Sequence, residues 1–87
     1  MKILMQPIEM IAWFTQEGTP NPIHYKLTSV DAASIVVKVD RVVTRSEEKI
    51  AGNRMILFRC QSEMNGLLKP YELKYELNTC KWFLYKA

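Results

Sequence analysis

The side chains in this chain that are best suited to catalysis or metal binding are those of two cysteines, Cys60 and Cys80, and one histidine, His24. A protein zinc site uses about four Cys, His or carboxylate ligands, and Cys-x-x-Cys spacing is its usual sign. The sequence contains no such pair, and His24 cannot complete a site with two cysteines. As a general base, His24 would need a nucleophile and an orienting carboxylate, which only a fold that brought Asp31 or Asp40 close could supply. We therefore expect a surface histidine, with no metal, cofactor or catalytic site.

The carboxylates also favour structural roles. Glu47 and Glu48 are adjacent at a predicted helix start, where negative charge is favourable. Glu72 and Glu76 have basic partners across a predicted sheet, unlike the facing acid and base of a glycosidase. The three glycines are too scattered for a phosphate-binding loop. The chain is therefore expected to be non-enzymatic, with no small-molecule substrate.

The last third of the chain predicts a three-stranded antiparallel meander. Asn65-Gly66 is a strong hairpin signal, because a type I′ turn needs positive φ at both central residues. It pairs residues 53–63 with 67–77, and a second tight turn at Asn78-Thr79 sets Leu77 opposite Cys80. Both turns place the same apolar face on all three strands, and a one-residue slip would destroy this agreement. The expected pairs are Cys60 with Tyr71, Phe58 with Leu73, Ile56 with Tyr75, Tyr75 with Trp82, and Leu73 with Leu84.

This register argues against a disulfide. Cys60 and Cys80 lie on strands that flank a shared neighbour, which separates them by ~10 Å. They are also offset along the strands, whereas disulfide Cα atoms lie within ~7 Å of each other. We expect two reduced thiols, both facing the core.

The reverse face of the meander mixes large apolar side chains with charges. Leu57, Lys74 and Phe83 form one row, and Arg59, Glu72 and Tyr85 form the next. Ion pairs are expected between Arg59 and Glu72 and between Glu76 and Lys81. A solvent face does not need so many apolar side chains, so three interpretations compete: cover by the first three strands, a homodimer or partner interface, or a base-stacking platform. The candidate binding residues are Leu57, Arg59, Lys74, Lys81, Phe83 and Tyr85, with Trp13 as a second aromatic candidate.

The first half of the chain predicts three more strands. Residues 8–15 alternate, with Ile11 and Trp13 on the face opposite Ile8 and Met10. Residues 23–28 form the second strand, and 29–33 a loop. Residues 34–44 form a long third strand, bent around Asp40-Arg41 as in a sheet that turns a corner. Thr44-Arg45-Ser46-Glu47 matches a capping box, so one short helical turn is expected near residues 44–51.

These elements predict one all-β domain over residues 1–87. Its six strands would form a small antiparallel up-and-down barrel or a strongly curved sheet. A length of 87 residues leaves no room for a second domain, and 48% hydrophobic content excludes disorder.

Charge and hydropathy set the expected location and partners. The net charge is +3, and residues 34–87 carry ten of the 12 basic residues, a thinner basic stripe than dedicated nucleic-acid binders show. No apolar run approaches the ~20 residues of a membrane span. Gln6, Pro7 and Glu9 interrupt the apolar start of a signal peptide. We expect a cytoplasmic protein with no membrane partner.

The expected function is therefore a non-enzymatic interaction module. It would present the amphipathic sheet face to a second copy or to a protein partner. The alternative is a single-stranded nucleic-acid binder that uses the aromatic and basic side chains of the same face. Salt separates the two, since only phosphate binding weakens steeply as salt rises.

Overall fold

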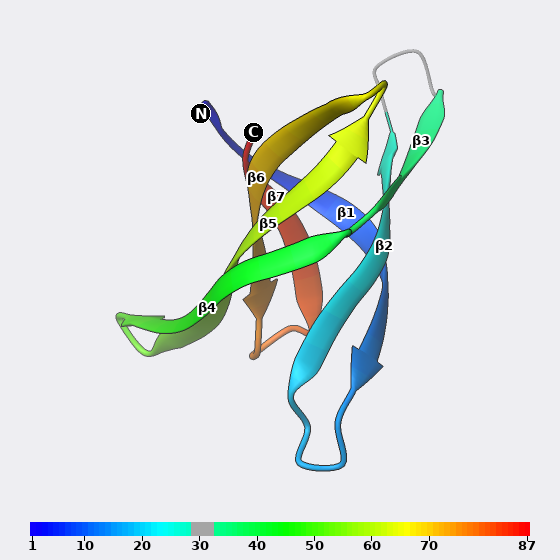
Figure 1. Ribbon diagram of the computed structural model, residues 1–87. Helices are drawn as coiled ribbons and strands as arrows, with labels where there is room; N and C mark the ends of the chain where they lie inside the picture. Colours follow the sequence, from blue (N-terminus) through cyan, green and yellow to red (C-terminus); the bar gives the residue numbers. More distant parts are fainter. Residues whose placement is uncertain (29–32) are drawn as a thin grey trace.

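The computed structural model describes residues 1–28 and 33–87, and these form one antiparallel sheet that curls into a half-barrel (Figure 1). Its strands run in the order β3-β2-β1-β7-β6-β5-β4. Two meanders, β1–β3 and β4–β7, therefore join where β1 pairs with β7. The all-β class and the strongly curved antiparallel sheet are confirmed. The strands are β1 (Ile3–Phe14), β2 (Pro20–Thr28), β3 (Ser34–Lys38), β4 (Arg41–Ile50), β5 (Asn53–Met64), β6 (Leu67–Glu76) and β7 (Lys81–Lys86).

The predicted third strand is divided at its expected bend, which raises the strand count of the described residues from six to seven. β3 pairs with β2, whereas β4 pairs with β5. At the corner, the Val39 N–H donates to the Ile23 carbonyl (2.8 Å) and the Asp40 N–H donates to the Gln61 carbonyl (3.2 Å). The chain thus passes from one edge of the sheet to the other, which curls the sheet. The predicted loop at 29–33 lies, except for its last residue, outside the described residues.

The predicted helical turn near residues 44–51 is wrong. β4 continues to Ile50, and Ala51 and Gly52, with φ of 51° and 83°, make a tight turn into β5. The Glu47 carboxylate accepts hydrogen bonds from the Arg54 guanidinium across this hairpin instead of capping a helix. Pairing with β5 therefore outweighs the local capping preference.

The C-terminal meander has the predicted register. β5 and β6 pair from Met64–Leu67 to Met55–Glu76. The first turn has positive φ at Asn65 and Gly66, as a type I′ turn requires. The second turn is longer than predicted and spans residues 77–80, yet the expected pairs of β6 with β7 are present.

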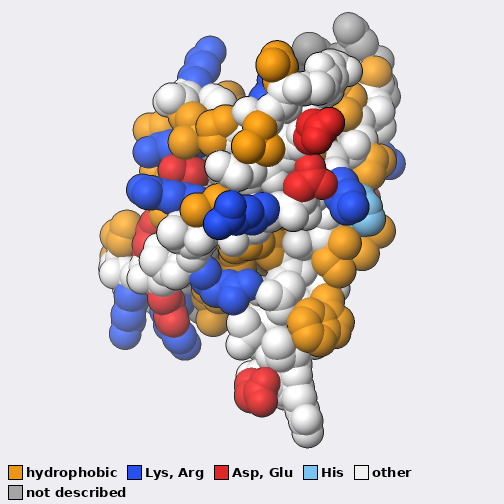
Figure 2. Space-filling model, viewed as in Figure 1, with side chains coloured by type: hydrophobic (Ala, Val, Ile, Leu, Met, Phe, Trp, Pro, Cys, Tyr) orange, Lys and Arg blue, Asp and Glu red, His pale blue; other side chains and the backbone are white. Residues whose placement is uncertain are grey.

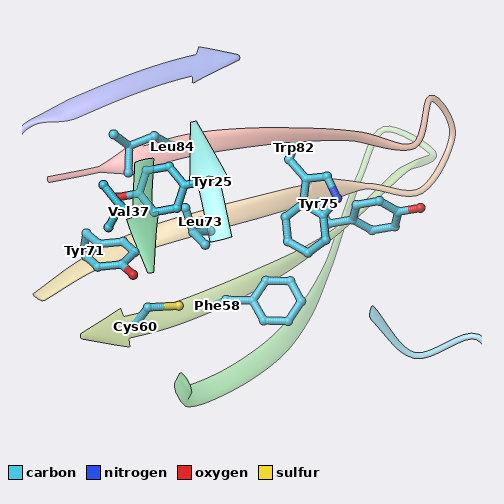
Figure 3. Packing of buried hydrophobic residues seen from close by; sticks show 9 residues of the cluster. All are labelled: Tyr25, Val37, Phe58, Cys60, Tyr71, Leu73, Tyr75, Trp82 and Leu84. Atoms are coloured by element: carbon cyan, nitrogen blue, oxygen red, sulfur yellow. The ribbon is translucent and has the colours of Figure 1, made fainter. Parts of the chain in front are cut away.

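The core lies on the concave face, where side chains from five strands point toward one another (Figure 3). Phe58 and Leu73 are fully buried at its centre. Phe58 stacks on Trp82 with ring centroids 5.4 Å apart. Tyr25, from β2, closes the core against Tyr71 at 5.6 Å. The first three strands therefore cover the concave face and not the reverse face of the meander.

A buried chain of hydrogen bonds fixes the corner between β3 and β4 against the core. The Ser62 hydroxyl donates to the Lys38 carbonyl (2.5 Å), so it accepts from the Tyr71 hydroxyl (2.6 Å). These bonds tie the end of β3 to β5 and β6.

Arg45 makes the contacts that hold the other end of the half-barrel together, away from this corner. Its guanidinium donates to the Asn21 side-chain oxygen (2.7 Å) and lies over the Phe58 ring, 5.2 Å from the centroid. This connects β4 to the start of β2. In residues 1–28 and 33–87, no helix combines the length and the apolar character needed to cross a membrane.

Candidate interaction surface

The predicted row of Leu57, Lys74 and Phe83 lies on the convex face of the sheet. Lys74 is the Cα partner of both Leu57 and Phe83, so β5, β6 and β7 each contribute one member. Pro7, from β1, extends the row beyond Phe83. Leu57 and Phe83 are half-buried.

The charge of Lys74 is neutralised within the face. Its ammonium lies 3.2 Å from the Glu48 carboxylate and 3.8 Å from the centroid of the Tyr85 ring. Only 8% of Lys74 is exposed. Glu48 was not predicted here, because the capping pattern had placed it on a helical turn. Strand alternation from Ser46 to Glu48 is the signal that points to it.

The neighbouring row also contains an internal ion pair. The Arg59 guanidinium lies 3.5 Å from the Glu72 carboxylate, which is buried, whereas Arg59 is exposed. The register shifts between Glu72 and Leu73, so Lys86 and not Tyr85 stands opposite Glu72. The expected row of Arg59, Glu72 and Tyr85 is therefore wrong in its last member.

Lys81 is exposed at the start of β7 and stands opposite Glu76 as predicted, but the two side chains do not form the expected ion pair. The Glu76 carboxylate accepts hydrogen bonds from Thr79 and Asn53, and these, with Lys81, lower the pKa of Glu76. Lys81 is thus the basic candidate that keeps the most freedom at this end of the face.

Trp13 lies apart from the row. Phe83 pairs with Pro7, and Trp13 is six residues further along β1, which is about 20 Å at a strand rise of ~3.3 Å. Trp13 is 60% exposed, and Ile11, two residues before it, is 67% exposed. Figure 2 shows that hydrophobic side chains reach the surface in separate patches between charged ones. The candidate residues therefore form two surfaces, the Lys74 row and the outer side of β1.

The two cysteines differ in environment. Cys60 is buried in the core, as predicted, and burial raises the pKa of its thiol to about 12. Cys80 is exposed, so the prediction that it faces the core is wrong. Its φ of 59° belongs to the turn and rotates the side chain out of the strand alternation. Both thiols are free.

His24 lies on the convex side of β2 between strand neighbours Ile11 and Lys38. Asp40, one of the carboxylates considered for it, accepts the Glu63 N–H (2.7 Å) at the corner instead. Asp31 is outside the described residues. Within the described part of the chain, no three His, Cys, Asp or Glu side chains are grouped to hold a metal ion.

A groove of ≈ 820 Å³ lies where β1 extends past the turn between β6 and β7. Met10, Ala12 and Phe14 line one side of this groove. Tyr75 and Trp82 line the other, with ring centroids 4.8 Å apart. Phe14 meets Tyr75 edge to face at 6.0 Å, and this contact bounds the groove.

Comparison of the chain with protein-family models, curated proteins and solved structures finds no match.

Proposed function

We propose that this chain is a non-enzymatic interaction module that acts by self-association or by binding a protein partner through the convex side of its sheet. The observation that carries the proposal is the exposure of Ile11 and Trp13 on one face of β1. Single exposed apolar residues are ordinary, but a tryptophan and an isoleucine at adjacent same-face positions form a patch. Tryptophan is also among the residues that most often dominate binding energy at protein interfaces.

The charges on the Lys74 row favour a protein partner over nucleic acid. Phosphate binding needs basic side chains that are free to replace counterions. Lys74 is paired with Glu48, and Arg59 with Glu72. Lys74 also lies on the face of Tyr85 on which a base would stack. The proposed face is completed at its edges by Arg59, Lys81, Leu57 and Phe83.

We place this activity in the cytoplasm, where Cys60 and the exposed Cys80 stay reduced. His24 supports the non-enzymatic part of the proposal, because its strand neighbours are an isoleucine and a lysine.

Replacing Trp13 with lysine is expected to weaken protein association by about 30-fold or more, the loss of ~2 kcal/mol typical of an interface hot spot. For the measurement, the chain is immobilised. We then quantify how much free chain it retains, and how much protein from the expressing cell, as the protein concentration is varied. The matched control is Ile50→Lys, because Ile50 is equally exposed but lies at the β4–β5 turn. Retention should be unchanged in this control.

Nucleic acid is tested in parallel with a labelled oligo-deoxythymidylate. We expect no binding at about 50 mM salt, where phosphate contacts are strongest. Binding that falls steeply by about 200 mM salt, together with equal retention by Trp13→Lys and wild type, would overturn the proposal in favour of nucleic acid.

A further inference from the structure

The far end of β1 is a partly unpaired sheet edge. β2 pairs with β1 as far as Phe14, whereas β7 pairs with it only from Ile3 to Ile8 (Figure 1). Extending the β7 register places Cys80 opposite Met10, and there the chain turns away, with the Cys80 N–H donating to the Glu76 carbonyl (2.9 Å). In the described part of the chain, residues 11–14 therefore have a strand neighbour on one side only.

The hydrogen-bond pattern shows which backbone groups face the open side. The Thr15 N–H donates to the Thr19 carbonyl (3.0 Å), so Thr15 directs its backbone groups toward β2. Directions alternate along a strand, so Trp13 also bonds to β2, while Ala12 and Phe14 point away from it. Their strand neighbours on β2, Pro22 and Pro20, have no N–H to donate, which fits this assignment. The open edge thus offers two N–H donors and two carbonyl acceptors.

We propose that two copies of this chain pair through this edge, antiparallel and about a two-fold axis at Trp13. The inference rests on the proposed interaction function and names a second copy as the partner. Ala12 of each copy exchanges both backbone hydrogen bonds with Phe14 of the other. The two Trp13 residues then face each other as a non-hydrogen-bonded pair, the arrangement in which cross-strand side chains are closest and aromatic pairs stabilise a sheet.

The side chains around the edge suit this pairing. Phe14 of the second copy lies beside Ala12, whose small side chain leaves room in the groove lined by Tyr75 and Trp82. On the convex side, the pairing covers Trp13 and places Ile11 opposite Thr15. Residues 10–16 contain no charge, so no like charges oppose each other within this segment.

The self-complementarity of the open edge favours a second copy as its partner. An open strand edge binds an extended segment by its backbone, and an antiparallel edge can match itself about a two-fold axis. The chain itself supplies the required uncharged, extended segment. Because four residues per copy bury less than the ~1,200 Å² of a stable complex, we expect a weak dimer in exchange with the monomer.

Disulfide trapping tests the register. In a Cys80→Ser background, Trp13→Cys places two thiols opposite each other at the axis. The expected Cα separation of ~4.5 Å for such a pair lies within the disulfide range. With oxidised glutathione we expect a covalent dimer, detected by non-reducing electrophoresis. The matched control is Ile11→Cys in the same background: it is equally exposed but faces Thr15 of the second copy, so dimer formation should be lost.

Adding Ala12→Pro to Trp13→Cys should also abolish the covalent dimer. This substitution removes an N–H that points away from β2, so circular dichroism should show an intact sheet. Equal cross-linking of Ile11→Cys and Trp13→Cys, or cross-linking that survives Ala12→Pro in a folded protein, would contradict the pairing. Absence of cross-linking in Trp13→Cys, together with a wild-type chain that stays monomeric in sedimentation as its concentration rises, would overturn the second copy as partner. The wider function would then be judged by whether retention of other proteins depends on Trp13.

Discussion

Replacing Phe58 with alanine is expected to destabilise the fold by about 3–5 kcal/mol, the range for truncating a buried aromatic residue. Phe58 is fully buried, stacks on Trp82 at 5.4 Å and lies under the Arg45 guanidinium, 5.2 Å from the ring centroid. The loss is a large part of the 5–15 kcal/mol that holds a typical domain together. Urea unfolding followed by circular dichroism measures it.

The control is Leu67→Ala at the β5–β6 hairpin, where the leucine is 64% exposed. Surface substitutions of this kind change the free energy of unfolding by about 0.5 kcal/mol or less. If Phe58→Ala were no more costly than Leu67→Ala, the concave face would not be the core of the protein.

Alkaline pH is expected to unfold the protein between about pH 9 and pH 12. Burial raises the pKa of Cys60 from 9.0 to about 12 and the pKa of Tyr25 from 10.0 to about 12. Burial also raises the pKa of Tyr71. Each of these groups is neutral below its unfolded-state pKa, where its contribution to stability is complete. As pH rises toward the folded-state pKa, the unfolded state loses protons first, and the stability is lost.

One pKa unit corresponds to about 1.4 kcal/mol, so the pKa shifts of these groups together lower the free energy of unfolding by several kcal/mol at alkaline pH. The measurement is the free energy of unfolding as a function of pH. Cys60→Ala should make its decline above about pH 9 shallower, because one proton is removed from the linkage. Leu67→Ala, which replaces an exposed side chain and removes no titratable group, should leave the slope unchanged. Ionisation of all four tyrosines near pH 10 in a protein that stays folded would contradict the prediction.

The C-terminal meander was predictable because its turns carry their own conformational signal. Asn65 and Gly66 both adopt positive φ, and one turn position fixes the register of every pair along β5 and β6. The bend near Asp40 was predictable for a similar reason, since charges interrupt an otherwise apolar strand. Because the local sequence determines these features, they could be predicted from the sequence.

The segment from Thr44 to Ile50 shows where this reasoning fails. Its capping box is a local pattern, whereas the strand it forms depends on pairing with β5. The error also concealed the contact of Glu48 with Lys74, which changes a free cation into a neutralised one. Whether a charge on a sheet face is neutralised therefore depends on partners that lie two strands away in the sheet.

The arrangement of the candidate binding residues was predicted only in part. Leu57, Lys74 and Phe83 share a row as expected, but Trp13 lies away from it. The open edge at Ala12 and Phe14 arises because β1 is longer than β7, whose turn is placed by contacts with β6. No local pattern in β1 contains that information.

Amide hydrogen exchange, resolved by residue and measured at low and high protein concentration, tests the pairing of β1 most directly. We expect slow exchange at Ile11 and Trp13 at every concentration, because both amides bond to β2. At Ala12 and Phe14 we expect fast exchange in dilute protein and slower exchange as the concentration rises. Fast exchange at Ala12 and Phe14 at all concentrations, or protection of both in the dilute monomer, would contradict this pairing.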